Sequence, residues 1–196
     1  MNELWIVRHG ATQWSDGGRH TSTTDVPLTD DGRAAAAALG PPLAQHRFAL
    51  VLTSPMARAR ATAAAAGFPD ARVDDDLREW DYGDLEGLTT SDIRERGGAF
   101  AQWSIWRGPV PGGETIDEVA ERARRVIGRV DAAGGDVLCF GHGHASRVLT
   151  AVALELAPDA GAHLLLEPAT ISVVGSEREV RALRRWNSAP PPTPSG

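Results

Sequence analysis

Cationic side chains follow three apolar runs of the sequence. Arg8 and His9 come directly after WIV, Arg58 comes five residues after ALVLT, and His142 and His144 follow VLCFG. Guanidinium and imidazole groups are suited to an anion such as a phosphate dianion. Glycines beside the histidines let backbone N–H groups approach the same anion. We therefore expect these residues to form a phosphate-binding site.

The elements that must position these residues are predicted by the hydrophobic pattern. Strand-length apolar runs alternate with helical patterns, which is typical of an α/β fold: three layers, with a mostly parallel central sheet between helices. We expect strands at 4–7, 49–53, 137–140 and 171–174, and helices at about 30–39, 57–66, 115–133 and 145–156. In such sheets ligands bind outside the carboxyl ends of the strands. The cations should therefore meet at one edge of the sheet.

Composition limits the class of protein. The chain has 196 residues, 42% of them hydrophobic, and a formal net charge of −6, which disfavours binding to nucleic acid or to a membrane surface. Cys139 is the only cysteine, so no disulfide framework is possible and a cytoplasmic location is expected. The sequence has no apolar run of membrane-spanning length. We expect a single domain over residues 1–188 and a disordered, proline-rich tail over 189–196.

Six short motifs occur in a fixed order along the chain. They are RHG (8–10), PLTDDGR (27–33), TSPMARARATA (53–63), EWDYGDLEG (79–87), PGGET (111–115) and GHGH (141–144). In this order they resemble the histidine phosphatase superfamily, in the branch that includes cofactor-dependent phosphoglycerate mutases and small-metabolite phosphatases. The resemblance spans most of the chain. It implies the α/β fold described above, with a small lid formed by about residues 80–113.

The resemblance also implies catalytic roles. His9 would be the nucleophile and would carry the phosphoryl group on a ring nitrogen, while Arg8, Arg58 and His142 surround the phosphoryl oxygens. Glu79 would protonate the departing alcohol and later deprotonate the attacking water. These roles fit phosphoryl transfer, in which the protein mainly positions the reactants and stabilises charge. No metal or organic cofactor is implied.

Residues that contact the rest of the substrate are also suggested by the resemblance. The expected set is Ser15, Thr21, Ser22, Tyr82, Arg107 and Gly143. The hydroxyl-bearing residues could instead stabilise a polar turn of their own. His144 could contact the substrate or cap the following helix, and Trp103 and Trp106 could belong to the lid or to the core.

The distal cations separate a phosphatase from a mutase. Related mutases carry an insertion with a lysine and two adjacent arginines, whereas here Arg107 is followed by Gly108 and the segment has no lysine. We therefore expect hydrolysis of a small phosphorylated metabolite. The sequence pattern looks most like that of sugar-phosphate phosphatases and broad-specificity acid phosphatases. A phosphoglycerate-type mutase and a non-catalytic phospho-ligand-binding module are the alternatives. Ala11 stands where the family usually has glutamate or glutamine. The oligomeric state has no signal in the sequence.

Overall fold

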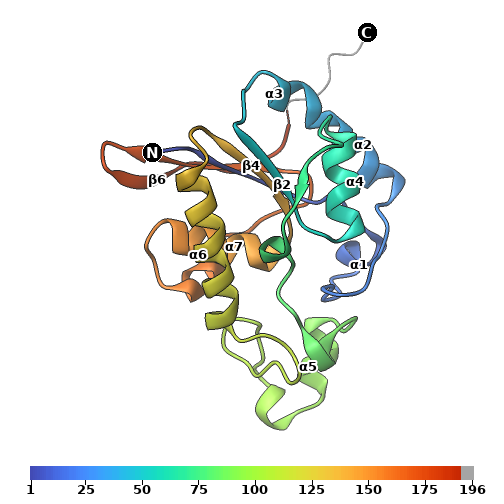
Figure 1. Ribbon diagram of the computed structural model, residues 1–196. Coiled ribbons are helices and arrows are strands. Elements are labelled where there is room, and N and C mark those ends of the chain that lie inside the picture. Colours follow the sequence, from blue (N-terminus) through green and yellow to red (C-terminus); the bar gives the residue numbers. More distant parts are fainter. Residues whose placement is uncertain (191–196) are drawn as a thin grey trace.

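The computed structural model describes residues 1–190, and its centre is a mixed sheet of six strands (Figure 1). The strands are β1 (Leu4–Arg8), β2 (Leu50–Thr53), β3 (Arg72–Val73), β4 (Val137–Gly141), β5 (Ile171–Glu177) and β6 (Val180–Ser188). Their order is β3-β2-β4-β1-β5-β6. The first four strands in this order run parallel, β5 pairs antiparallel with β1, and β6 pairs antiparallel with β5. The mostly parallel sheet predicted from the sequence is confirmed.

Helices surround the sheet. They are α1 (Gln13–Asp16), α2 (Asp30–Ala38), α3 (Gly40–Ala44), α4 (Ala57–Ala65), α5 (Thr90–Glu95), α6 (Ile116–Ala132) and α7 (Gly143–Ala153). Short 3-10 turns lie at Asp75–Leu77, Gly83–Leu85, Gly98–Phe100 and Pro158–His163. Within residues 1–190, no helix has the length and apolar character needed to cross a bilayer.

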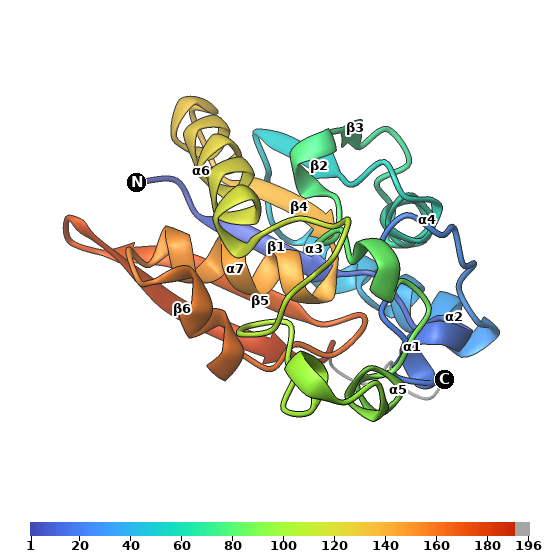
Figure 2. The same ribbon diagram turned by 90° about the horizontal axis from the view of Figure 1, so that it is seen from below.

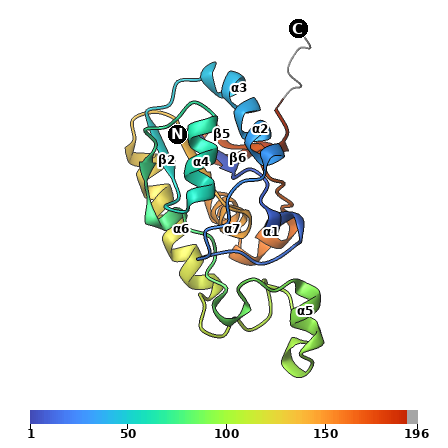
Figure 3. The ribbon, with the colours of Figure 1, turned by 90° about the vertical axis from the view of Figure 1, so that its right-hand side faces the viewer.

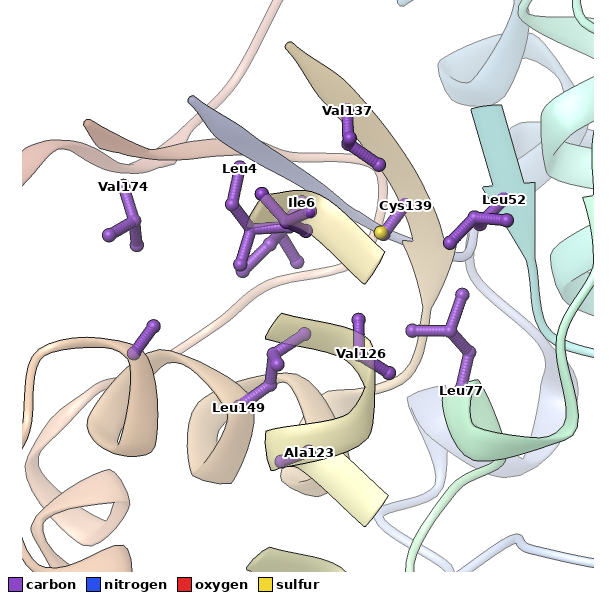
Figure 4. Close-up of a cluster of buried hydrophobic side chains, with 12 residues drawn as sticks. Leu4, Ile6, Leu52, Leu77, Ala123, Val126, Val137, Cys139, Leu149 and Val174 are labelled. Atoms are coloured by element: carbon purple, nitrogen blue, oxygen red, sulfur yellow. The ribbon is translucent and has the colours of Figure 1, made fainter. Parts of the chain in front are cut away.

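Two hydrophobic cores lie on opposite faces of the sheet, because successive strand side chains point to opposite sides. Ile6 and Cys139 face α6 and α7, where they pack against Val126 and Leu149 (Figure 4). The neighbouring residues of β1 and β4 point to the other face and pack against α2, α3 and α4 (Figure 2). The expected three layers are therefore present.

Several predicted boundaries differ from the structure. Helix α2 ends at Ala38, close to the predicted 39, but the prolines that follow Gly40 form the first turn of another helix, α3, where their missing N–H groups need no partner. Helix α7 begins at Gly143 rather than at 145. Strands β3 and β6 were not predicted, because β3 has only two residues and β6 is rich in arginine.

The segment between residues 80 and 115 projects from the sheet and carries α5 (Figures 1 and 3). It has its own apolar cluster, in which Trp80, Trp103 and Ile93 pack with Val119 of α6 and Val148 of α7. Trp103 is therefore buried in the core of this projecting segment, and it does not form an exposed part of a lid. Of the tail expected at 189–196, residues 191–196 lie outside the described residues.

Candidate active site

A pocket of about 160 Å³ lies at the carboxyl edge of the parallel strands, where the sequence predicted a phosphate site. Its lining comprises Arg8, His9, Ser15, Gly18, Arg19, His20, Thr21, Glu79, Tyr82, Gly143, His144, Arg147 and Leu166. The volume is below the roughly 300–1,000 Å³ that is typical of drug-sized ligands. The pocket therefore suits a small molecule.

His9 follows β1 and is held in one tautomer. Its Nδ1 lies 2.8 Å from the carbonyl oxygen of Gly10, which can only accept, so Nδ1 carries the proton in this bond. Burial, followed by the positive charges of Arg8 and Arg58, lowers the pKa of His9 well below its usual value. The ring is therefore neutral at pH 7 and Nε2 has a free lone pair. A lone pair of this kind is what a nucleophilic histidine requires.

His142 follows β4 and lies beside His9, with ring centroids 5.2 Å apart. The side chain is fully buried, and its Nε2 is 2.7 Å from the hydroxyl oxygen of Ser54 at the end of β2. Burial and the charge of Arg58 lower the pKa of His142. Its Nδ1 is buried and has no hydrogen-bond partner among the described residues.

Arg8 and Arg58, the two arginines predicted to bind phosphate, each donate hydrogen bonds to backbone carbonyl groups. Arg8 donates from Nη1 to the carbonyl of Leu166. Arg58, in the first turn of α4, is fully buried and donates to the carbonyls of Thr21, Ser22 and Thr24 at 3.0–3.1 Å. Each arginine keeps a buried Nε with no partner among residues 1–190. Because buried donors are usually satisfied, these two N–H groups are available to an acceptor on a bound ligand.

The loop that accepts from Arg58 is itself held by Glu86. The backbone N–H groups of Ser22 and Thr24 donate to the Glu86 carboxylate at 2.9–3.0 Å, and the Ser22 hydroxyl donates to it at 2.6 Å. Ser22 is thus buried against Glu86 and is not among the residues that line the pocket. In this structure its hydroxyl supports the loop around Arg58.

Glu79 lies at the N-terminus of α7. Its Oε1 accepts from the N–H groups of Trp80 (2.9 Å) and Ala145 (2.7 Å), and its Oε2 accepts from the N–H of His144 (3.1 Å). A Cβ atom built on Gly143 would lie 3.5 Å from the guanidinium carbon of Arg8 and 3.6 Å from Glu79 Oε2. Gly143 therefore keeps the helix backbone close to both charged groups.

Arg122 of α6 fixes the segment that carries Glu79. It donates to the carbonyls of Asp76, Arg78 and Glu79 at 2.7–3.1 Å and forms a two-pronged ion pair with Glu114 at 2.9 and 3.0 Å. The side chain of Arg122 is 4% exposed. Although Glu114 belongs to the PGGET motif, the sequence offered no partner for it.

The remaining predicted substrate residues divide into two groups. Ser15, Thr21 and Tyr82 line the pocket together with Gly143. The Ser15 and Thr21 hydroxyls also donate to the backbone, at Thr12 and Arg19 respectively, as in the self-stabilised turn considered above. Arg107 is exposed and lines other clefts, so the structure does not bring it to the pocket.

Several lining residues were missed from the sequence. His20 had no recognisable partner pattern, and its position depends on how the loop 14–24 folds against the projecting segment. Arg147 had a usable signal: it lies three residues after His144 in α7, and so on the same helix face. His144 itself does not cap α7; its ring lies against Tyr82, with Nδ1 2.7 Å from the tyrosine oxygen.

Several known proteins are similar to this chain in sequence. An acid phosphatase of Mycobacterium tuberculosis is 37% identical over 93% of this chain and 90% of its own length. A sedoheptulose 1,7-bisphosphatase of Saccharomyces cerevisiae is 36% identical, covering 75% of this chain and 65% of its own. A 2,3-bisphosphoglycerate-dependent phosphoglycerate mutase 2 of Gloeobacter violaceus is 35% identical, covering 81% and 78%.

The fold agrees with these matches. The solved structure of an open reading frame product of Mycobacterium tuberculosis superposes with a TM-score of 0.90 at 36% identity, covering 96% of this chain and 98% of that one. The family model of the histidine phosphatase superfamily (branch 1) matches residues 4–189. Its members include phosphatases of phosphorylated metabolites, in agreement with the chemistry of the pocket. The chain therefore belongs to the histidine phosphatase superfamily.

Proposed function

We propose that the protein is a metal-independent phosphomonoester hydrolase that works through a phosphohistidine at His9. The observation that carries the proposal is the set of unsatisfied buried groups around this residue. The Nε–H donors of Arg8 and Arg58 have no partners among the described residues, although burial makes an unpaired donor costly, and the ring nitrogen His142 Nδ1 has none either. A phosphoryl group beside His9 would supply acceptors for them.

In the first step, the lone pair of His9 Nε2 attacks phosphorus, so that an N–P bond forms and the P–O bond to the alcohol breaks. Glu79 gives its proton to the departing oxygen. The guanidinium groups of Arg8 and Arg58 stabilise the charge on the phosphoryl oxygens, which is the main task in this class of reaction. The proposal assigns this charge to the arginines and needs no metal ion.

In the second step, water replaces the alcohol. Glu79, now a carboxylate, takes a proton from the water while the water oxygen attacks phosphorus. A P–O bond forms, the N–P bond breaks, and His9 regains its lone pair as inorganic phosphate leaves. Glu79 is again protonated, so atoms and charges balance over the cycle.

The substrate we propose is a small phosphorylated metabolite, of the sugar-phosphate class. The pocket of about 160 Å³ supports a small leaving group. The names of two relatives, acid phosphatase and sedoheptulose 1,7-bisphosphatase, support phosphatase chemistry and a sugar phosphate.

The direct test measures phosphate release in the presence of a chelator, for wild type and for His9→Ala. We expect release by wild type and at least a thousand-fold loss in the variant, because triad-like nucleophiles contribute rate factors of about 10³ or more. Rapid quenching should trap a protein-bound phosphoryl group in wild type only. Equal release by both proteins would reject the nucleophile.

A phosphoglycerate mutase is the second candidate, because one relative at 35% identity carries that name. Against it, the distal cation proposed from the sequence, Arg107, lies away from the pocket. A mutase would move phosphate between carbon positions of phosphoglycerate and would depend on a bisphosphate primer. Primer-dependent transfer without net phosphate release would favour this candidate over the hydrolase.

A further inference from the structure

Two imidazole rings of the pocket have no part in the steps above. His20 and His144 stack with ring centroids 6.0 Å apart and an angle of 6° between their planes. Each uses Nδ1 for a hydrogen bond to the protein. Among residues 1–190, Nε2 of neither ring has a hydrogen-bond partner, and both side chains line the pocket.

The tautomer of His20 follows from its partner. Nδ1 lies 2.9 Å from the carbonyl oxygen of Leu88, which can only accept, so Nδ1 carries the proton. Burial lowers the pKa of His20, so the ring is neutral at pH 7. Nε2 of His20 is then a hydrogen-bond acceptor.

The tautomer of His144 is opposite. Burial raises the pKa of Tyr82 well above its usual value, so the phenol keeps its proton, and the only acceptor at hydrogen-bond distance in the described chain is His144 Nδ1 at 2.7 Å. Burial, followed by the charge of Arg147, lowers the pKa of His144, so this ring is also neutral. Its single proton is therefore on Nε2, which is a hydrogen-bond donor.

An acceptor and a donor on stacked rings match a group that can both donate and accept. We propose that His20 and His144 recognise a neutral hydroxyl group on the departing alcohol. This inference rests on the proposed hydrolase function and names the substrate feature that the pocket selects. A carboxylate or a second phosphate can only accept, so it would face the lone pair of His20 Nε2.

Two arginines besides Arg8 also line the pocket, and both already donate hydrogen bonds to backbone carbonyl groups. Arg147 donates to the carbonyls of Gly161 and Ala162 at 2.9 Å, and its guanidinium lies 4.6 Å from the ring centre of Trp106. Arg19 is exposed and donates to the carbonyl of Gly87 at 2.7 Å. Because these cations could still attract an anionic substrate, the test includes one.

The test compares three compounds with a three-carbon skeleton. Glycerol 3-phosphate carries neutral hydroxyls, 3-(phosphonooxy)propanoate carries a carboxylate and no hydroxyl, and propyl phosphate carries neither. For wild type we expect kcat/KM to be highest for glycerol 3-phosphate, about ten-fold above propyl phosphate, which corresponds to about one good hydrogen bond.

Variants locate the effect. In His20→Phe, we expect the ratio of kcat/KM for glycerol 3-phosphate over propyl phosphate to fall about ten-fold, towards one. Tyr82→Phe keeps the buried ring but removes the hydroxyl that fixes the tautomer of His144, and it should lower the same ratio. His163→Phe is the matched control, because His163 is exposed and lies outside this pocket.

The outcomes separate the inference from the function beneath it. Hydrolysis of all three compounds with equal kcat/KM, or a preference for 3-(phosphonooxy)propanoate, would overturn the hydroxyl-recognising pair while leaving the hydrolase in place. An unchanged ratio in both His20→Phe and Tyr82→Phe would also overturn it. Absence of phosphate release from these compounds and from an aryl phosphate would reject the hydrolase itself, and the inference with it.

Discussion

At the scale of single residues, the same cations serve two purposes at His9. Arg8 and Arg58 help to lower the pKa of the imidazole, which keeps Nε2 unprotonated, and they offer donors to the phosphoryl group that Nε2 receives. The carbonyl of Gly10 completes the arrangement by holding the proton on the opposite ring nitrogen. A nucleophile, its tautomer and its electrostatic support are thus set by three consecutive residues and one helix residue.

Two glycines in the site should respond differently to alanine. A Cβ on Gly10 would lie 2.4 Å from the carbonyl oxygen of Gly32, whereas a Cβ on Gly143 meets nothing closer than 3.5 Å. We expect Gly10→Ala to lose about 1–3 kcal/mol in the free energy of unfolding and to lower kcat, because the backbone beside His9 must shift. Gly143→Ala should keep its stability within about 0.5 kcal/mol and raise KM.

Urea unfolding and steady-state kinetics on the two variants provide the measurement. Equal stability of both proteins would contradict the close approach of the Gly10 and Gly32 backbones.

At the scale of elements, helix α7 and the segment 76–81 together present Glu79. The first N–H groups of α7 have no acceptor within the helix and instead donate to the carboxylate, as is typical of a helix N-terminus. Arg122, reaching across from α6, holds the backbone on the other side of Glu79. Glu79 is therefore positioned by two helices that both lie far from it in the sequence.

Removal of Arg122 should impair Glu79 without removing it. We expect Arg122→Ala to cost about 2–3 kcal/mol, because the partly buried Glu114 carboxylate and the loop carbonyls lose their partner. Among molecules that remain folded, kcat should fall more for an alkyl phosphate than for an aryl phosphate, whose leaving group needs less help from a proton donor.

Arg122→Lys is the matched control, because it keeps the charge but loses the two-pronged geometry. Circular dichroism would identify the folded fraction, and kcat for both phosphates would be measured on it. Equal losses for the two phosphates would show that Arg122 acts on stability alone.

At the scale of the whole molecule, the pocket concentrates buried neutral histidines. Burial is the first cause of the lowered pKa at each of His9, His20, His142 and His144. In the unfolded chain these groups take up protons near pH 6.5, while in the folded state they resist protonation. Stability is therefore full above about pH 6.5 and is lost as the pH falls below it.

This coupling predicts acid-sensitive stability. Between about pH 6.5 and 5.5, each histidine that stays neutral in the folded state should contribute a slope that rises from about 0.7 to about 1.2 kcal/mol per pH unit to the unfolding free energy. Urea unfolding at a series of pH values would measure the slope. His144→Gln should reduce the slope by the contribution of one histidine. A free energy of unfolding that does not change over this interval would contradict the buried neutral state.

The sequence was informative where function depends on residues beside strand ends. Arg8 and His9 lie where the pattern predicted, because a strand end and the turn after it are local features. The interest of Glu79 came from the family resemblance, since no strand was predicted before it. Ser22 and Arg107 were expected at the substrate pocket but do not line it, because the direction of a loop side chain depends on its partners in space. The role of His20 likewise depends on the carbonyl of Leu88, 68 residues away.

The position of β1 in the sheet has a consequence for biosynthesis. This strand leads into His9, yet it lies between β4 and β5, whose pairing residues begin at Val137 and Ile171. The candidate nucleophile is thus synthesised long before the two strands that fix it. Long-range pairing of this kind slows folding, and nascent chains that lack β5 cannot yet have an assembled active site.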